Sequence, residues 1–453
     1  MAPPQTGSDR APATIAVDDQ LPDGEATSAV RRAPFSENPE VGARGQRTQQ
    51  RILDAAQQVF GERGYHRSGI AHITKVAGCS RATFYQYFSG KEDVFRQLTG
   101  QVARQLRAST EALSALTDDL DGWRATRAWV GRHADIYERY EPVFHAFQAA
   151  SDSDEAVAPA AARTAERNVA RFRSKVASTT LPPRKLDPVL SLLMECLTRA
   201  HETARLLRSA APDAYPRERV EDALADVMHR TLFGLRADVN VHPPAACRPP
   251  TLAFGPVMRD ALRRGDTTHE LTAAGRRTFT ALVDSGRDVF VTRGYHGTRI
   301  DDVVVAAGLS HGAFYRYFEG KEQLAQTLAV RAMRNVSTSL IEIPGPAHDG
   351  SPDRAALRRW LRRYNATQAT EAAMIRVWVD ATLEDPTLRA DSAAATDWGR
   401  RVMTRFLRPR DFGDVDTEAV VMLALLSAFG TRERPAAMTD AAAHIIERGL
   451  LGR

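Results

Sequence analysis

The chain has 453 residues, of which 43% are hydrophobic and 26% are charged, and its formal net charge is +5. This composition is that of a folded protein with about two to four domains, and it excludes a wholly disordered chain. The basic excess is small, so it is compatible with a polyanionic partner without identifying one.

Three cysteines, Cys79, Cys196 and Cys247, lie far apart and form no Cys-x-x-Cys or Cys/His spacing. We therefore expect neither a disulfide framework nor a metal site, and we expect a reducing cytoplasm as the compartment. The sequence has no apolar run of about 18 residues, which argues against a membrane span.

Residues 1–43 are rich in Ala, Pro and Ser and show no apolar period, which predicts a disordered leader. The segment TQQRILDAAQQVFGERG then predicts a helix with one apolar face that stops at Gly64. The segment GIAHITKVAG predicts a second helix ending at Gly78. Ser80 is a natural N-cap for a third helix, RATFYQYF.

Two short helices separated only by Gly78, Cys79 and Ser80 predict a helix-turn-helix, whose second helix lies in the major groove of DNA. A fourth, longer helix begins at SGKEDVFRQL. We place a first helix-turn-helix DNA-binding domain at 44–98 and a first helical regulatory domain at 99–237.

Prolines interrupt the helical pattern in NVHPPAACRPPTLAFGP, and we predict a linker over 238–270. The pattern then returns, with a second helix-turn-helix domain predicted over 271–328 and a second helical regulatory domain over 329–453. Alternating β patterns are missing, and apolar residues recur every three or four positions. The expected fold class is all-α.

An internal repeat supports this division, because residues 51–95 align with 281–325 without a gap. The identities gather at turn glycines and aromatic residues, which indicates one fold made twice. Identical positions include Gly64, Tyr65, Gly78, Ser80, Phe84, Tyr85, Tyr87, Phe88, Gly90 and Lys91, which match Gly294, Tyr295, Gly308, Ser310, Phe314, Tyr315, Tyr317, Phe318, Gly320 and Lys321.

The stretches AGCSRATFYQYFSGKEDVF and AGLSHGAFYRYFEGKEQLA resemble the signature of TetR-type bacterial transcriptional regulators. The resemblance covers about 50 residues of each copy strongly and the remaining helical regions loosely. It implies two TetR-like units, each with a helix-turn-helix domain and a helical domain that senses a ligand and dimerises. It also implies a bacterial cytoplasmic protein that is associated with the nucleoid when bound to DNA.

The two copies differ in charge. Residues 44–107 hold 11 basic and 4 acidic residues, an excess of 7, whereas residues 274–337 hold 9 and 6, an excess of 3. An excess of this size is enough for a phosphate footprint, and the first copy should be the stronger electrostatic anchor.

Roles follow from position on the third helix, whose N-terminal residues face base edges. The base-reading candidates are Ser80, Arg81, Thr83, Ser310, His311, Ala313 and Arg316. The resemblance and the basic surface add phosphate candidates, which position the helix without specifying sequence. These are Arg44, Arg47, Tyr85, Lys91, Arg276, Arg277, Tyr315 and Lys321.

Two alternatives remain open for these helices. The Ser and Thr side chains can be helix caps without any base contact. Tyr87 and Tyr317 are either core or surface aromatics, while we assign Phe84, Phe88, Phe314 and Phe318 to the core.

Aromatic residues at helical spacing in 119–150 and 357–383 suggest a pocket for an apolar or amphipathic effector, although an ordinary helical core produces the same stripe. The pocket candidates are Trp129, His133, Tyr137, Phe144, Trp360 and Trp378. The resemblance implies release of a repressor by such an effector, of unknown identity.

In the family, the final two helices of each unit build a dimer interface. We therefore hypothesise a single-chain pseudo-dimer, with 186–236 packing on 414–451, that binds an asymmetric operator because its two heads differ. A homodimer of tandem chains is the runner-up.

We expect no enzymatic activity and no cofactor, because the sequence has no GxSxG, HExxH, phosphate-binding loop or dinucleotide fingerprint. A degenerate helical adaptor without specific DNA binding is the rival function. The basic face of the first copy argues against it.

Overall fold

A computed structural model describes residues 42–151, 157–242, 249–256, 258–259, 262, 271–345, 353–382, 386–430 and 435–453. Almost all of the expected leader, and much of the expected linker, lie outside these residues. Within them the regular elements are all helices, and the one β-bridge joins Leu116 and Val176. The predicted all-α class is confirmed.

The first half consists of a small head and four longer helices. The head comprises α1 (Ala43–Arg63), α2 (Ile70–Ala77), α3 (Arg81–Tyr87) and the start of α4 (Lys91–Glu111). The body adds α5 (Leu120–Ser151), α6 (Val157–Arg173), α7 (Pro183–Ala210) and α8 (Arg217–Phe233).

The second half repeats this order. Its head comprises α10 (Ala273–Gly297), α11 (Ile300–Ala307), α12 (His311–Tyr315) and the start of α13 (Lys321–Ile341). Its body adds α14 (Arg354–Thr382), α15 (Pro386–Leu407), α16 (Val415–Gly430), α17 (Ala436–His444) and the π-helical turn η3 (Ile445–Leu450).

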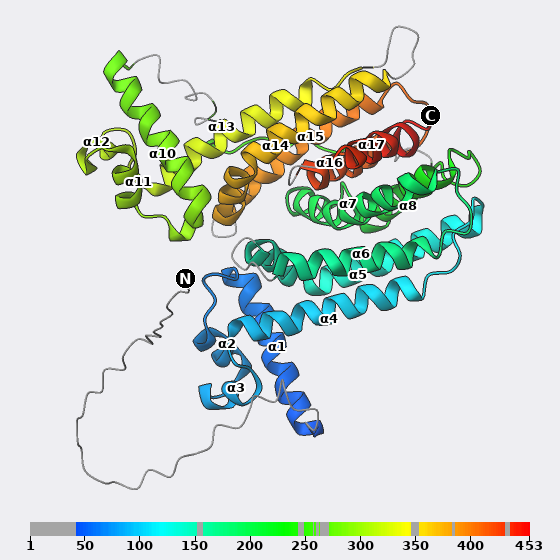
Figure 1. The fold of residues 1–453 in the computed structure, drawn as a ribbon, viewed down its shortest axis with the longest axis horizontal. Helices are drawn as coiled ribbons and strands as arrows, with labels where there is room; N and C mark the ends of the chain where they lie inside the picture. The colour runs from blue at the N-terminus through cyan, green and yellow to red at the C-terminus, as the bar shows by residue number, and fades with distance from the viewer. Residues whose placement is uncertain are drawn as a thin grey trace, which may run out of the picture.

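The bodies meet in the middle of the molecule. Helices α7 and α8 lie against α16, α17 and η3, and both heads lie on the left side of the molecule in Figure 1, the first next to α4 and the second next to α13. One apolar core crosses this boundary, since Leu193 and Leu197 of α7 belong to the same buried cluster as Val421 and Leu425 of α16. Each head has a separate core of its own.

Two parts of the expected linker are fixed to the bodies, one at His242 and one at Leu252 and Gly255. His242 hydrogen-bonds to the Asp226 carboxylate of α8, with Nδ1 to Oδ2 at 2.9 Å. On the far side, the backbone N–H of Leu252 donates to Asp397 at 3.0 Å, and that of Gly255 donates to Asp391 at 2.6 Å. Both acceptors belong to α15 of the second half.

No described helix is both long and apolar enough to cross a membrane. The described residues also contain no group of three potential metal ligands.

Candidate nucleic-acid interface

The turn of the first head is fixed by local chemistry. Gly78 adopts a left-handed conformation, with φ 60° and ψ 41°, and ends α2. The Ser80 hydroxyl oxygen then accepts a hydrogen bond from the Thr83 backbone N–H at 3.0 Å and caps α3. These two predictions are confirmed. Behind the turn, the predicted core residues Phe84 and Phe88 are fully buried.

The second head repeats this geometry on a shorter helix. Gly308 has φ 63° and ψ 32°, and Ser310 accepts from the Ala313 N–H at 3.3 Å. Helix α12 has five residues, whereas α3 has seven. Arg316 therefore stands just after the last residue of α12 and not within it. The core prediction is again confirmed for Phe314 and Phe318.

The cap role that we left open for the serines is the one observed. Ser80 and Ser310 use their side-chain oxygens on backbone N–H groups, and Ser80 also lies 3.0 Å from the Thr83 hydroxyl. Base contact by these residues stays a prediction. Tyr87 is buried and Tyr317 half-buried, so both tyrosines belong to the head cores.

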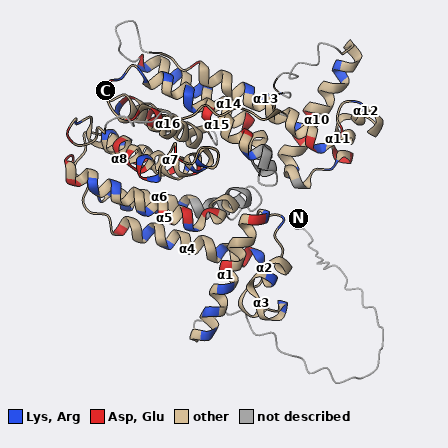
Figure 2. Ribbon diagram, turned by 180° about the vertical axis from the view of Figure 1, so that it is seen from behind, with Lys and Arg blue, Asp and Glu red and all other residues tan. Residues whose placement is uncertain are grey.

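The exposed surface of the reading helices differs between the heads. Arg81 is exposed and α3 carries it at its first position, whereas α12 contains neither Lys nor Arg (Figure 2). In the second head His311 pairs with Asp301 of α11 at 2.6 Å. A carboxylate therefore lies beside the candidate reading surface of this head.

Most of the phosphate candidates are on the surface. Arg44 and Arg47 are exposed near the start of α1, and Arg276 and Arg277 are exposed near the start of α10. Tyr85 is 39% exposed and Tyr315 is 56% exposed, whereas the phenylalanine before each of them is buried. Their position on the outer side of each reading helix suits a phosphate contact.

The two lysine candidates have a structural contact that the sequence did not indicate. The Lys91 ammonium donates to the Tyr65 carbonyl oxygen at 3.1 Å and lies 4.3 Å from the centre of the Tyr65 ring. Lys321 makes the same contacts with Tyr295, at 3.0 Å and 4.6 Å. Burial lowers the pKa of Lys91, while Glu92 opposes the shift. The only sequence signal was that the tyrosine and the lysine are each identical in the two copies, which marks the positions without indicating that they touch.

The aromatic candidates lie on two helices, α5 of the first half and α14 of the second, and Trp129 and Trp360 belong to the same buried core. Trp129, His133 and Tyr137 are buried on α5, and Phe144 packs on Tyr137 with ring centres 5.3 Å apart. Trp360 is buried on α14 and donates to the Ser339 carbonyl oxygen at 2.8 Å. The side chain of Trp378 lies outside the described residues.

Beside the candidates on α5 lies a residue that sequence reasoning missed. His201 of α7 stacks on His133, with ring centres 5.5 Å apart. Both side chains are buried, and neither His133 Nδ1 nor His201 Nε2 has a hydrogen-bond partner. Burial lowers the pKa of His133 to about 4, so the imidazole is neutral at pH 7. The first body thus holds two neutral imidazoles with unused hydrogen-bonding atoms.

The strongest similarity to known proteins lies in the two heads. Residues 52–98 and 282–328 each match the family model described as bacterial regulatory proteins, tetR family. A stretch of 71 residues is 35% identical to the uncharacterized HTH-type transcriptional regulator YdgC of Bacillus subtilis, over 16% of this chain and 36% of that protein. Another of 59 residues is 41% identical to the fatty acid metabolism regulator protein of the same organism, over 12% and 30%.

A longer and weaker match reaches beyond the head. Over 191 residues the chain is 25% identical to the HTH-type transcriptional regulator EthR of Mycobacterium tuberculosis, which covers 40% of this chain and 86% of that protein. The chain spans about a third of the length of the first two relatives.

Proposed function

We propose that this chain, a tandem member of the tetR family with one family domain in each half, binds duplex DNA and regulates transcription. The observation that carries the proposal is the pair of capped helix-turn-helix units, each with an exposed first turn on its third helix. The basic excess of the first head supplies the phosphate attraction. The named relatives that support it are transcriptional regulators.

The two heads have different side chains at their reading positions, so each half-site is expected to have its own sequence. Arg81 of the first head is suited to a bidentate contact with guanine, whereas His311 of the second is held by Asp301. We infer an asymmetric operator, with the first head as the main anchor.

The arrangement of the bodies supports a single-chain pseudo-dimer. Related regulators are expected to pair two identical chains, which places half-sites in two-fold symmetry. Here the equivalent helix pairs face each other within one chain. Light scattering of the free protein at nanomolar to micromolar concentration tests this, and a stable dimer would favour the runner-up, a homodimer of tandem chains.

Control by a small molecule is the finer part of the proposal. An amphipathic effector with a hydrogen-bonding group suits the cluster of Trp129, Tyr137, His133 and His201, because two buried imidazole nitrogens there lack partners. Its binding should lower DNA affinity and so release a repressor; coupling of this kind typically changes affinity about 5–150-fold. A ligand that stabilises the protein without changing DNA affinity would contradict this part.

The deciding experiment is selection of duplexes from a random pool, followed by titration of the selected site at two salt concentrations. Arg81→Ala should cost about 1–3 kcal/mol and relax preference at one base position. Arg362→Ala, an exposed arginine on α14, is the matched control and should change neither affinity nor preference. Failure to select any site, with weak binding that Arg81→Ala leaves intact, would favour the adaptor alternative.

A further inference from the structure

The two bodies end in related segments. The first ends in His-Arg-Thr-Leu-Phe-Gly over 229–234, and the second ends in Glu-Arg-Gly-Leu-Leu-Gly over 447–452. The closing glycines, Gly234 and Gly452, both have positive φ, at 94° and 68°. The two segments are therefore equivalent, which makes Thr231 the counterpart of Gly449.

These counterparts lie against each other across the boundary between the halves. A Cβ atom added to Gly449 would lie 2.3 Å from the Thr231 hydroxyl oxygen and 2.9 Å from the Val227 carbonyl oxygen. Those distances are far below van der Waals contact, so α8 approaches η3 this closely only because residue 449 has no side chain. Gly449 of the second half leaves space because it has no side chain, and the Thr231 side chain of the first half occupies that space.

Charge is divided between the halves in the same unequal way. Arg230 of α8 is fully buried and donates to the Gly449 carbonyl at 2.7 Å, to the Asn240 carbonyl at 2.8 Å and to Glu418 of α16 at 2.5 Å. Glu418 is fully buried too, and it also accepts from Arg410 of the second half at 2.6 Å. Removing the acid would leave a buried guanidinium without its counter-charge, which is strongly unfavourable.

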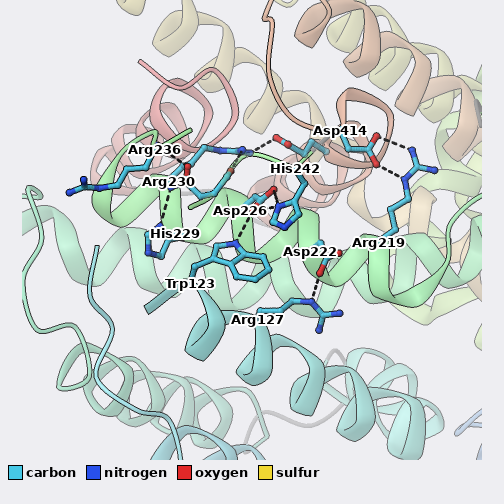
Figure 3. A network of polar contacts seen from close by, with 12 residues as sticks. Trp123, Arg127, Arg219, Asp222, Asp226, His229, Arg230, Arg236, His242 and Asp414 are labelled. Atoms are coloured by element: carbon cyan, nitrogen blue, oxygen red, sulfur yellow. Dashed lines mark hydrogen bonds and ion pairs between the residues drawn. The ribbon is translucent and has the colours of Figure 1, made fainter. Parts of the chain in front are cut away.

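A second ion pair has the same direction. Arg219 of α8 binds Asp414, which lies just before α16, through two hydrogen bonds, one of them 2.9 Å long (Figure 3). In both pairs the first half contributes the base and the second half the acid. Figure 3 shows Arg219 and Arg230 reaching from α8 toward the second half, away from Trp123 and Arg127.

A first half that faced a second copy of itself would lose both features. Thr231 would meet the counterpart threonine where the structure has no room for even a Cβ atom. Arg230 would meet α7 in place of α16, and the residues that α7 buries include no carboxylate. Both the packing and the charge therefore oppose this pairing.

We propose that the face of α7 and α8 is built to bind the α16–η3 face of a second half and to reject a second copy of itself. The selectivity resides in the first half, because Gly449 offers no comparable steric block between two second halves. The inference rests on the proposed pseudo-dimer and identifies the contacts that decide which halves pair. The same contacts would act if two chains exchanged halves.

The test uses the full chain with a protease site placed within 243–248 and cut after folding. Native mass spectrometry should find particles with one first-half and one second-half fragment. Dilution then gives the affinity between fragments, and Gly449→Ala should weaken it at least about tenfold. Gly449 has no positive φ, so alanine does not strain the backbone.

Thr231→Ala in the same chain removes the hydroxyl that the added methyl would meet, so the double variant should recover part of the lost affinity. Glu418→Gln keeps the shape and removes the charge that Arg230 binds across the boundary and Arg410 binds within the second half. It should also weaken the affinity between fragments, independently of Gly449, and Arg410→Gln, which removes only the contact within the second half, is its control. Glu418→Gln decides the question if Gly449→Ala does not fold.

Particles with two first halves would overturn the proposal, as would unchanged affinity in both Gly449→Ala and Glu418→Gln. Titration of the uncut chain with the selected DNA is kept as a separate readout. If the chain does not bind DNA but its first half still pairs with its second half, the proposed function is rejected and the proposed pairing preference stands.

Discussion

The junctions between head and body occupy the same place in the two halves but are held by different side chains. In the first half, Gln57 of α1 donates to the Arg139 carbonyl oxygen, and Gln105 donates to the Tyr140 hydroxyl at 2.9 Å. Tyr140 also leaves helical geometry, with φ −117° and ψ 19°, two residues before Pro142. A polar cavity of about 230 Å³ opens beside these contacts.

The second junction is charged. Arg287 of α10 donates to the Thr370 carbonyl oxygen at 2.7 Å and pairs with Glu371 at 3.2 Å. Asn335 donates to the other Glu371 oxygen at 2.8 Å, and the Glu371 side chain is only 5% exposed. In the register of the repeat, Arg287 takes the place of Gln57 and Asn335 that of Gln105.

The two junctions therefore differ in their polar contacts. The first head has the larger basic excess, and its junction combines neutral hydrogen bonds with apolar packing on Ile136 and Val143 of α5. The second head is clamped by a nearly buried carboxylate whose two oxygens both have partners. We expect substitutions at the charged second junction to cost more stability than substitutions at the neutral polar contacts of the first.

The two halves should differ most in how strongly acid destabilises them. Burial lowers the pKa of His133 to about 4 and that of His201 well below its ordinary value, so the folded protein binds fewer protons than the unfolded chain below about pH 6.5. Stability should therefore fall as pH drops from about 6.5 to about 4, by up to about 3 kcal/mol for His133.

Urea unfolding across this pH range, with hydrogen exchange resolved by helix, measures that loss. It should appear first in α5 and α7, and His133→Phe should reduce it. Equal acid sensitivity in α10 and α14 would contradict the assignment.

Arg287→Ala should have the next largest effect, because it leaves the buried Glu371 carboxylate with Asn335 as its remaining partner in this junction. The expected cost is about 2 kcal/mol. Hydrogen exchange in α10 should accelerate while exchange in α1 stays as it was. Unchanged exchange in α10 would mean that the ion pair does not fix the second head.

Lys91→Ala and Lys321→Ala test a feature in which the two halves should be alike, because the two heads have the same lysine–tyrosine contacts. Each substitution removes one hydrogen bond to a tyrosine carbonyl and one ring contact, at a cost of about 1 kcal/mol. Thermal unfolding of the two variants should give similar losses. A loss confined to one variant would show that the two heads are not equivalent in stability.

Gln57→Ala should have the smallest effect, about 0.5 kcal/mol, because its hydrogen bond is neutral and exposed. Exchange in α1 should rise slightly, and DNA affinity should be nearly unchanged. A loss as large as that of Arg287→Ala would erase the distinction between the junctions.

The turns of the heads could be predicted from sequence because their causes are local. The end of α2 requires a left-handed residue, which glycine readily supplies at position 78, and Ser80 caps α3 through the N–H of Thr83, three residues later. Neighbouring residues therefore decide both features. The end of the third helix was predicted to within one residue, since α3 ends at Tyr87, whereas α1 begins at Ala43, five residues before the segment predicted for it.

The remaining features depend on contacts between distant segments. Lys91 meets Tyr65 across the head, His201 joins His133 from another helix, and the Glu371 clamp requires three helices. Helical periodicity places each residue on one face of its own helix but does not show which other helix that face contacts. Base contacts and effector binding are proposals for the same reason, since their partners are separate molecules.

The fixed ends of the connecting segment give the tether a short effective length. His242 is held on the first body and Leu252 on the second, so only residues 243–251 lie between the anchored points. A connection of this kind keeps two separated faces at a local concentration of order millimolar. After any transient opening, the faces therefore meet each other again far more often than they meet those of another molecule at micromolar concentration, and dilution should not separate them.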